Sequence, residues 1–400
     1  MKNFNLPDRV MYILDRIESI GHRADVVGGP VRDFLLGKAP YDYDITTDAT
    51  PDEVKEIFSD HRTVDTGIKH GTVTLVLDGE NYEITTYRID GEYKDSRHPE
   101  TVSFTTSLRE DLSRRDFTMN AIAYNPRRGI TDCHGGVEDV KSGVIRAVGD
   151  PRKRFTEDAL RILRGIRFAS VLGFKLDDAT KQASIELRHL LSAVSAERIF
   201  TEWKKLVSGE FAYEVITEYK SVIEVFLPEL KDMRLPTRER FDNAEPFVRM
   251  LSLFYTGMDT CGKDYRNAML RLHTDSATRD AGALVLDSVG KFDTGTAYGI
   301  KKIMSEYDSE IARLTLMLES LLEVGNDGSI EMYNQIVESR EPYRTVDLDL
   351  NGNDLASLGY RGTQIGKEMR ALLDRVMRGD LKNERKALLS AASANAPTVD

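Results

Sequence analysis

The chain has 400 residues, of which 40% are hydrophobic and 30% charged, which is enough apolar material for two to four folded domains. No apolar run approaches the roughly 18 residues of a membrane span, and the polar start "MKNFNLPDRV" lacks the apolar core of a signal peptide, so we expect a cytoplasmic protein. The net charge of -11 argues against a protein that binds a polyanion over most of its surface, so any nucleic-acid contact should be confined to a local region. Cys133 and Cys261 stand alone, which excludes a Cys-rich zinc site and assigns both to packing.

The first 90 residues are predicted to form a mixed α/β unit. Apolar residues at helical spacing predict a helix between Pro7 and Gly21. The stretch "RADVVGG" predicts a short buried strand that turns into a helix over Pro30 to Gly37. After it, "DYDITT" predicts a strand, "TPDEVKEIF" a helix with a capping box, and "GTVTLVL" with "YEITTYR" a hairpin around an Asp-Gly turn.

Beyond this unit the pattern changes, and the strand signals fade from Asp150 onward. Residues 92–112 are polar and interrupted by Pro99, which predicts a mobile loop or a loosely held ribbon. From Asp150 onward, long helical patterns run with few Pro or Gly interruptions, so the remainder is predicted to be mainly α-helical. The small polar tail "AASANAPTVD" is expected to be disordered. The fold class is therefore α+β, with a mixed sheet at the N-terminal end and helices after it.

Two aspartates, Asp42 and Asp44, stand one residue apart at the start of a predicted strand. Because alternate residues of a strand face the same side, their carboxylates should lie about 4 to 5 Å apart and repel by roughly 3 to 4 kcal/mol at an effective dielectric near 20. A cation between them would relieve this, and Mg²⁺ prefers such ligands. Glu83 on the hairpin could add a third carboxylate for a two-metal phosphoryl transfer. The structural alternatives are a solvated turn and a surface glutamate.

A Gly-Gly turn precedes these aspartates. Gly28 and Gly29 let backbone amides approach an anion closely, and the helix that follows points its N-terminal donors at the same place. Arg32 adds a guanidinium fork suited to phosphate oxygens. Such a turn is more often a plain connection between a strand and a helix, but ahead of paired aspartates it is consistent with a triphosphate site.

The stretch "RRDFTMNA", residues 114–121, groups polar side chains around apolar ones. Arg115 could meet a phosphate, while Asp116 and Asn120 are short acceptor and donor groups of the kind that hold a ribose hydroxyl. For this octapeptide alone, the alternative is the start of a helix with a local Arg-Asp pair.

The stretch "RFTEDALRILRGIRF", residues 154–168, predicts one amphipathic helix with a basic face. A carboxylate beside a guanidinium, as at Asp158 and Arg161, complements the base edges of cytosine and adenine and opposes those of uracil and guanine. Such a bidentate contact discriminates by about 1 to 3 kcal/mol. The alternative is a solvated face in which Asp158 pairs with Arg161 along the helix.

In this order the motifs resemble the class II tRNA nucleotidyltransferases, the bacterial CCA-adding enzymes of the DNA polymerase β superfamily. The resemblance rests on "GGPVRDFLLG", "DYDIT", "RRDFTMNA", "RFTEDALRILRGIRFA" and "SAERIFTEW", and covers about the first 205 residues. The stretch from "NGNDLASLGYRG" onward resembles the family's tail, whereas residues 210–340 match only in being helical. The resemblance to this family implies a catalytic head over 1–150, a helical neck with a nucleotide-template helix over 151–208, a body over 209–300 and a tRNA-binding tail over 301–400.

The resemblance also implies roles for individual residues. Asp42 and Asp44 would hold Mg²⁺, with Glu83 as a third carboxylate. The nucleotide-binding residues that it implies are Gly29, Arg32 and Arg115 for the triphosphate, Asp116 and Asn120 for the ribose, Asp158 and Arg161 as a template for CTP and then ATP, and Arg164 and Arg167 on the same face. Glu197, Arg198 and Glu202 match a motif thought to brace the neighbouring helices; the alternative is a pair between Arg198 and Glu202 within one helix.

Relatives that add only CC, only A, or poly(A) share these motifs. The stretch "DGEYKDSRHPETVSF" resembles a flexible loop that CC-only enzymes lack, although it reads Arg97-His98-Pro99 where Arg-Arg-Pro is common. "RRDFTMNAIA" is closer to the CCA type than to the poly(A) type, which leaves A-only addition as the main alternative. A non-catalytic RNA-binding module would show a damaged carboxylate set. The expected partners are the tRNA 3′ end, CTP and ATP, with no membrane, as a monomer or a homodimer.

Overall fold

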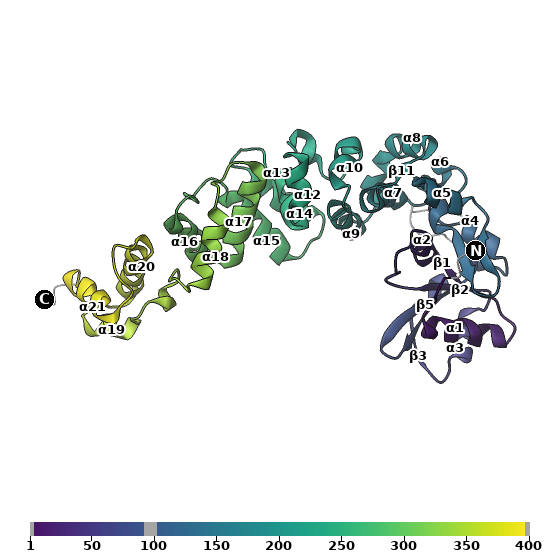
Figure 1. The fold of residues 1–400 in the computed structure, drawn as a ribbon, viewed down its shortest axis with the longest axis horizontal. Coiled ribbons are helices and arrows are strands. Elements are labelled where there is room, and N and C mark those ends of the chain that lie inside the picture. The colour runs from purple at the N-terminus through teal and green to yellow at the C-terminus, as the bar shows by residue number, and fades with distance from the viewer. Residues whose placement is uncertain (1–3, 92–101, 397–400) are drawn as a thin grey trace. The chain divides into compact units, whose positions relative to one another are not determined.

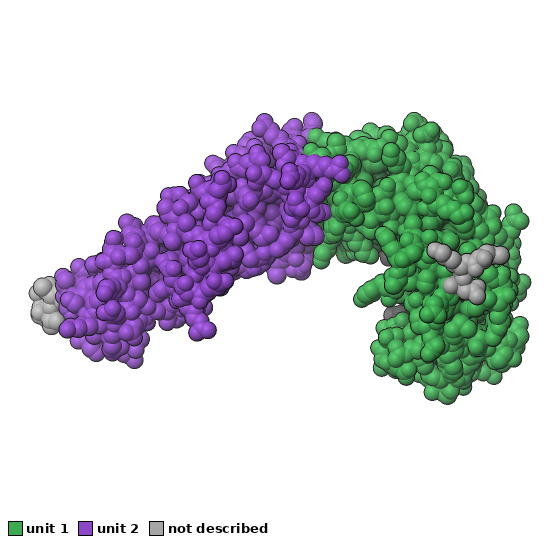
Figure 2. All heavy atoms as spheres, in the orientation of Figure 1, with its two compact units in different colours: residues 1–228 green, residues 229–400 purple. Residues whose placement is uncertain are grey.

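The computed structural model describes residues 4–91 and 102–396 (Figure 1). Its contacts divide the chain into two compact units, unit 1 over Met1–Pro228 and unit 2 over Glu229–Asp400 (Figure 2). None of the helices within the described ranges has the length and apolar character that a bilayer crossing requires.

A seven-stranded mixed sheet forms the N-terminal part of unit 1, in the order β3-β4-β5-β2-β1-β8-β9. Its strands are β1 (Ala24–Val27), β2 (Asp44–Thr47), β3 (Arg62–Gly67), β4 (Thr72–Leu77), β5 (Glu80–Thr86), β8 (Ile122–Asn125) and β9 (Gly129–Asp132). Strands β2 and β5 are parallel, and the other neighbours are antiparallel. The predicted mixed sheet is therefore confirmed.

Local signals explain the elements that carry this sheet. The β4–β5 hairpin turns at Asp78 and Gly79, whose φ angles of 51° and 83° give the left-handed pair that tight hairpins need. Helix α3 (Pro51–Ile57) begins with the predicted capping box between Thr50 and Glu53. Helices α1 (Asp8–Ser19) and α3 pack side by side, and α2 (Gly29–Leu35) follows β1 directly (Figure 1). These elements agree with the sequence prediction.

The prediction of a mobile loop or a loosely held ribbon over residues 92–112 agrees with the strand at Val102–Phe104 and is wrong for residues 108–112, which are helical. Residues 92–101, which carry most of the loop that resembles the family's flexible loop, lie outside the described residues. Beyond them, β7 (Val102–Phe104) pairs with β6 (Arg88–Asp90), and α4 (Leu108–Ser113) starts at Ser107, whose side chain accepts a hydrogen bond from the Glu110 amide. A helix of six residues is too short for hydrophobic periodicity to reveal.

Helix α4 is held by the core beneath the sheet. Its Leu108 and Leu112 pack with Val27 of β1, Ala123 of β8 and Tyr87 in one buried cluster. Cys133 packs against the same cluster, and Cys261 is buried at the start of α14, so both cysteines serve packing as predicted. Helix α4 is therefore fixed beside β1 and β8, and its Asp111 reaches Thr46 of β2 at 3.3 Å.

The single helix predicted over residues 154–168 is two helices. Helix α6 (Pro151–Glu157) ends at Asp158, whose φ and ψ of -142° and 104° are extended, and α7 (Leu160–Leu172) starts just after it. The Asp158 carboxylate accepts a hydrogen bond from the Leu160 amide at 3.1 Å. Apolar periodicity could not show this break, because the side chain of one aspartate competes locally with the helical hydrogen bonds.

The rest of the described chain is mainly helical, as predicted, apart from the short parallel pair of β10 (Val144–Ile145) and β11 (Lys175–Leu176). Unit 1 continues with α5 (Gly136–Ser142), α8 (Asp178–Glu186), α9 (Ala196–Val207), α10 (Ala212–Glu218) and α11 (Lys220–Ile223). Unit 2 contains α12 (Arg238–Asn243), α13 (Pro246–Phe254), α14 (Cys261–Arg271), α15 (Ser276–Ser288), α16 (Ala297–Glu306), α17 (Ser309–Leu322), α18 (Ser329–Glu338), α19 (Gly352–Ser357), α20 (Thr363–Arg378) and α21 (Arg385–Ala394). The division into neck, body and tail stays a prediction.

The tail "AASANAPTVD" was expected to be disordered, which is wrong for its first residues. Helix α21 continues to Ala394 because Ala392 is fully buried against Leu388 and the apolar side of α20. Residues 397–400 lie outside the described part of the chain.

Candidate active site

A charged cleft of about 380 Å³ lies in unit 1, beside β2 and β5. Its lining residues are Val27, Asp44, Ile45, Thr72, Glu83, Thr85, Arg88, Arg114, Arg115, Asp116, Asp158, Leu160, Arg161, Arg164 and Arg198. Six of these are arginines and four are carboxylates. A cleft with this composition can hold a polyanion together with the cation that accompanies it.

The acidic edge of the cleft is built by the parallel pairing of two strands. Asp44 begins β2 and lies directly opposite Glu83 of β5. Asp42 was predicted on the same strand face as Asp44, which is wrong: Asp42 lies exposed in the bend before β2. Its charge still acts on Asp44.

Asp44 carries the electrostatic signature of this edge. Surrounding protein atoms displace part of the water from its carboxyl group, and the charges of Asp42 and Glu83 add repulsion, although Arg115 opposes them. Together these effects raise the pKa of Asp44 to about 6. A carboxylate shielded from water beside other carboxylates is stabilised by a cation placed next to it.

This donor set fits a hard divalent cation, because oxygen ligands under mutual repulsion are stabilised by a positive charge between them. In the two described stretches, no three His, Cys, Asp or Glu side chains are grouped closely enough to form a metal site by themselves. A cation at this edge would therefore be held by the aspartates together with water or substrate oxygens, which is the ligand mixture that Mg²⁺ prefers.

The Gly-Gly turn brings backbone close to one cleft arginine. Gly28 has a φ of 80°, and a Cβ atom added there would lie 3.1 Å from Nη1 of Arg115. A side chain at position 28 would thus be strained and would push against that guanidinium. Gly29 begins α2 beside it.

Arg32 lies beside the Gly-Gly turn, where a Cβ atom added at Gly29 would lie 3.8 Å from its Nη2. It donates to Asp33 at 2.8 and 3.0 Å and to the Asn120 Oδ1 at 2.8 Å. Of the catalytic and nucleotide-binding residues predicted from the sequence, seven line the cleft and six do not. The six outside are Gly28, Gly29, Arg32, Asp42, Asn120 and Arg167.

Asp116 is the centre of a hydrogen-bond network. Its Oδ2 accepts from Nε and Nη2 of Arg164 at 2.9 and 2.7 Å, and its Oδ1 accepts from the Phe117 amide and from Nδ2 of Asn120. Burial opposes the charge on Asp116, but Arg164 outweighs burial and lowers the pKa of Asp116 to about 2. Asp116, in the bend after α4, therefore pairs with Arg164 of α7, not with an arginine of its own segment as the alternative for "RRDFTMNA" supposed.

In the Asp116→Asn variant, the free energy of unfolding is expected to decrease less at acid pH than it does in the native chain. A depressed folded-state pKa gives stability that is present above the unfolded pKa, near 4, and is lost as the pH falls toward 2. The difference in unfolding free energy between native chain and variant should thus be greatest above about pH 5 and shrink by about 2 kcal/mol at lower pH. Urea titrations from pH 7 to 2.5 measure it, with exposed Asp52→Asn as the control; a constant difference would contradict the assignment.

The predicted contact between Asp158 and Arg161 is not made. Asp158 accepts from Nη2 of Arg198, on α9, at 2.7 Å. Arg161 is buried and donates to Glu157 at 2.8 Å and to the Arg154 and Arg114 carbonyls at 3.1 Å. Both residues line the cleft, but the guanidinium beside the Asp158 carboxylate comes from Arg198.

The α9 residues hold α7 through ion pairs across the two helices. Glu202 accepts from Nε of Arg167 at 2.9 Å and lies 3.8 Å from Nη1 of Arg164. Arg198 is likewise committed to Asp158, so the pair within α9 between Arg198 and Glu202 is absent from this described region. Nη1 of Arg198 is buried and has no hydrogen-bond partner among the residues described.

Sequence reasoning missed part of the cleft. Arg88 and Thr72 enter it from the hairpin side, and Arg198 enters it from α9, where it had been read only as a brace. Because successive strand residues face opposite sides, the sequence could have shown that the side chains of Arg88 and Ile89 point to different faces. No local signal could show that α9 packs against the end of α6.

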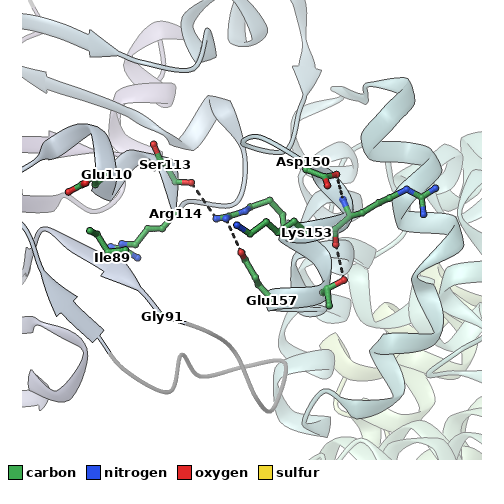
Figure 3. A pocket seen from close by; sticks show the side chains of 11 residues that line it. Ile89, Gly91, Glu110, Ser113, Arg114, Asp150, Lys153 and Glu157 are labelled. Atoms are coloured by element: carbon green, nitrogen blue, oxygen red, sulfur yellow. Dashed lines mark hydrogen bonds and ion pairs between the residues drawn. The ribbon is translucent and has the colours of Figure 1, made fainter.

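A larger pocket of about 910 Å³ lies between α4 and α6 and shares Arg114 with the cleft (Figure 3). Arg154 lines it and donates to the Ser113 carbonyl at 3.3 Å and to Glu157 at 2.9 Å. Asp44 and Glu83 are not among its lining residues. We therefore assign the candidate active site to the smaller cleft.

A mixed sheet that carries paired carboxylates at an arginine-rich cleft, followed by helices, defines a nucleotidyltransferase. Residues 24–146 match the family described as "Poly A polymerase head domain", and residues 173–233 match "Probable RNA and SrmB- binding site of polymerase A".

The chain belongs to the family of bacterial CCA-adding enzymes. It is 34% identical to a CCA-adding enzyme of Leuconostoc mesenteroides over 94% of this chain and 93% of that one, and 34% identical to one of Ligilactobacillus salivarius over 97% of both. The crystal structure of the Bacillus stearothermophilus CCA-adding enzyme in complex with CTP is 28% identical, covers 97% of both chains and superposes with a TM-score of 0.80. The resemblance and the α+β fold inferred from the sequence are thereby confirmed.

Proposed function

We propose that the chain extends the 3′ end of tRNA with C, C and A, consuming CTP and ATP and releasing pyrophosphate. The observation that carries the proposal is the charge arrangement of the cleft, with carboxylates on one edge and six arginines around the rest. Full-length similarity to relatives named CCA-adding enzymes supports the choice of product.

Binding of the nucleotide would use residues of the cleft together with the Gly28 turn and Asn120, which adjoin its lining. Arg115, with the Gly28 turn beside it, would hold the triphosphate, since guanidinium and backbone amides both favour phosphate oxygens. Asp116 and Asn120 would supply acceptor and donor groups to the ribose hydroxyls. Asp158 would accept the exocyclic amino group that cytosine and adenine share and that uracil lacks.

The acidic edge would hold Mg²⁺ through Asp42 and Asp44, with Glu83 beside them. When bound, such a cation lowers the pKa of a hydroxyl nucleophile and neutralises charge on a leaving pyrophosphate. The chain's own contribution is to place the tRNA 3′-hydroxyl and the α-phosphate in line and to orient charge toward them, which supplies most of the rate in phosphoryl transfer.

Helix α20 of unit 2 offers a surface for tRNA phosphates. Its apolar side is buried, whereas Lys367, Arg370 and Arg375 are exposed on the other side. Arginine and lysine side chains without a buried role suit sequence-independent contacts to the nucleic-acid backbone.

Replacement of Arg370 by alanine is expected to weaken tRNA binding and to lower the slope of log Kd against log salt by about 1, because one phosphate contact is lost. Filter binding from 50 to 300 mM KCl measures the slope. Arg313→Ala is the matched control, since Arg313 is committed to Glu245 and Glu310. Affinity of the native chain that did not change with salt would contradict the proposed contacts.

Primer extension at single-nucleotide resolution tests the reaction itself. Transcripts that end at the discriminator base, after C, after CC and after CCA are incubated with Mg²⁺, CTP and ATP. The proposal predicts that the first three are completed to CCA and that the fourth is not extended. Extension of the CC-ended transcript alone would instead identify an A-adding enzyme that works with a partner.

A further inference from the structure

Asp111 is a fully buried carboxylate on α4, and no role for it follows from the nucleotide contacts proposed above. Its Oδ1 accepts from Nε and Nη2 of Arg114 at 2.9 and 2.7 Å. Its Oδ2 accepts from Nη2 of Arg115 and from Oγ1 of Thr46, each at 3.3 Å. One buried group is therefore joined to two cleft arginines and to strand β2.

The Thr46 contact ties Asp111 to the acidic edge. Thr46 lies two residues after Asp44 on β2, so the two side chains point to the same face of the sheet. Asp111 is thus hydrogen-bonded to the face of β2 that carries Asp44. Leu108 and Leu112 hold α4 in place by packing in the buried cluster.

These contacts use only some of the hydrogen-bond donors of the Arg115 guanidinium. Its Nη2 is held by Asp111, its Nη1 lies against the Gly28 turn, and its buried Nε has no hydrogen-bond partner within the described ranges. Its charge also reaches Asp44. A guanidinium with an unused buried donor, beside a glycine turn, is prepared to accept an anionic ligand.

A free arginine at this place would have another partner. The carboxylates of Asp42, Asp44 and Glu83 attract it, and an ion pair with them would occupy both the cation edge and the anion-binding group. Asp111 supplies a fixed, buried alternative partner, whose Oδ2 lies 3.3 Å from Nη2 of Arg115. Burial opposes its charge, but Arg115 and Arg114 outweigh burial and keep the pKa of Asp111 below its ordinary value, so Asp111 stays ionised.

We propose that Asp111 is a positioning residue for nucleotide binding, which holds Arg115 between the Gly28 turn and Asp44 and keeps it from closing onto the acidic edge. This inference rests on the proposed function, in which Arg115 binds the triphosphate. Asp111 itself touches no substrate and acts through Arg115.

The test is a double-mutant cycle on CTP binding, measured by calorimetry with the full chain, Mg²⁺ and no tRNA. Asp111→Asn is expected to raise the Kd for CTP about tenfold, because the guanidinium loses its charged anchor. In an Arg115→Ala background the same change should have less than about a twofold effect. The Kd for tRNA should stay within about twofold throughout, which a general loss of structure would not allow.

Asp25 offers a matched control. It is also fully buried, and it accepts from two arginines, Arg23 and Arg128, and from the Tyr87 hydroxyl, but it does not line the cleft. Asp25→Asn should lower the melting temperature to a similar extent as Asp111→Asn and leave the Kd for CTP within about twofold. If both variants weakened CTP binding equally, Asp111 would be only structural.

The outcomes separate this inference from the proposed function. If Arg115→Ala left CTP binding unchanged, the triphosphate role of Arg115 would fail, and the inference with it. If Arg115→Ala weakened binding but Asp111→Asn did not, or if the two effects added, only the inference would be overturned. Should Asp111→Asn not fold, Arg115→Lys replaces it: a lysine as poor as alanine supports a positioned fork, whereas restored binding shows that charge alone suffices.

Discussion

Replacement of Asp42 by alanine is expected to lower kcat for nucleotide addition by about a thousandfold or more, while tRNA binding is retained. Asp42 lies exposed at the acidic edge, and its charge reaches Asp44, so its removal would take away one of the proposed cation ligands without disturbing a buried contact. Single-turnover addition to a CC-ended transcript measures the rate, and a gel shift measures tRNA binding.

Asp52→Ala is the control for this experiment, because Asp52 is an equally exposed carboxylate in the first turn of α3. It should retain full activity. Loss of tRNA binding by Asp42→Ala, together with an unfolded far-UV spectrum, would show a structural role for Asp42 and contradict the assignment of the edge.

The second large effect is expected in base choice. Asp158→Ala should lower the ratio of kcat/KM for CTP over UTP about ten- to a hundredfold, because the acceptor for the amino group of cytosine is removed. Arg198→Ala should lower it less, since Asp158 would lose only the guanidinium that holds it at 2.7 Å. Initial rates of addition with each nucleotide give both ratios.

Asp178→Ala, at an exposed position in the first turn of α8, controls for removal of an acidic side chain from the same helical region. It should leave selection unchanged. If Asp158→Ala rejected UTP as strongly as the native chain does, the carboxylate would have no part in reading the base.

Much of the fold could be predicted because its signals are local. The helix between Pro7 and Gly21, the turn at Gly28, the capping box at Thr50 and the turn at Asp78 each depend on neighbouring residues, and each is present. The signals failed where one side chain decided the outcome. Asp158 ends α6 by capping α7, and Ser107 starts a helix too short for periodicity.

The candidate site could be predicted only in part because its geometry is long-range. The parallel register of β2 and β5 sets Asp44 against Glu83, and no local pattern specifies that pairing. The partner of Asp158 proved to be Arg198 of α9 and not Arg161. Residue types of the right chemistry were visible in the sequence, but which of them meet was decided by the packing of helices and strands.

A crystal structure of the full chain with CTP and Mg²⁺ tests the central claim most directly, since it locates the nucleotide. The account predicts the triphosphate between Arg115 and the Gly28 turn, the cation against Asp42 and Asp44, and the amino group of cytosine within hydrogen-bond distance of Asp158. A nucleotide bound in the larger pocket between α4 and α6, or one whose base lies away from Asp158, would contradict it.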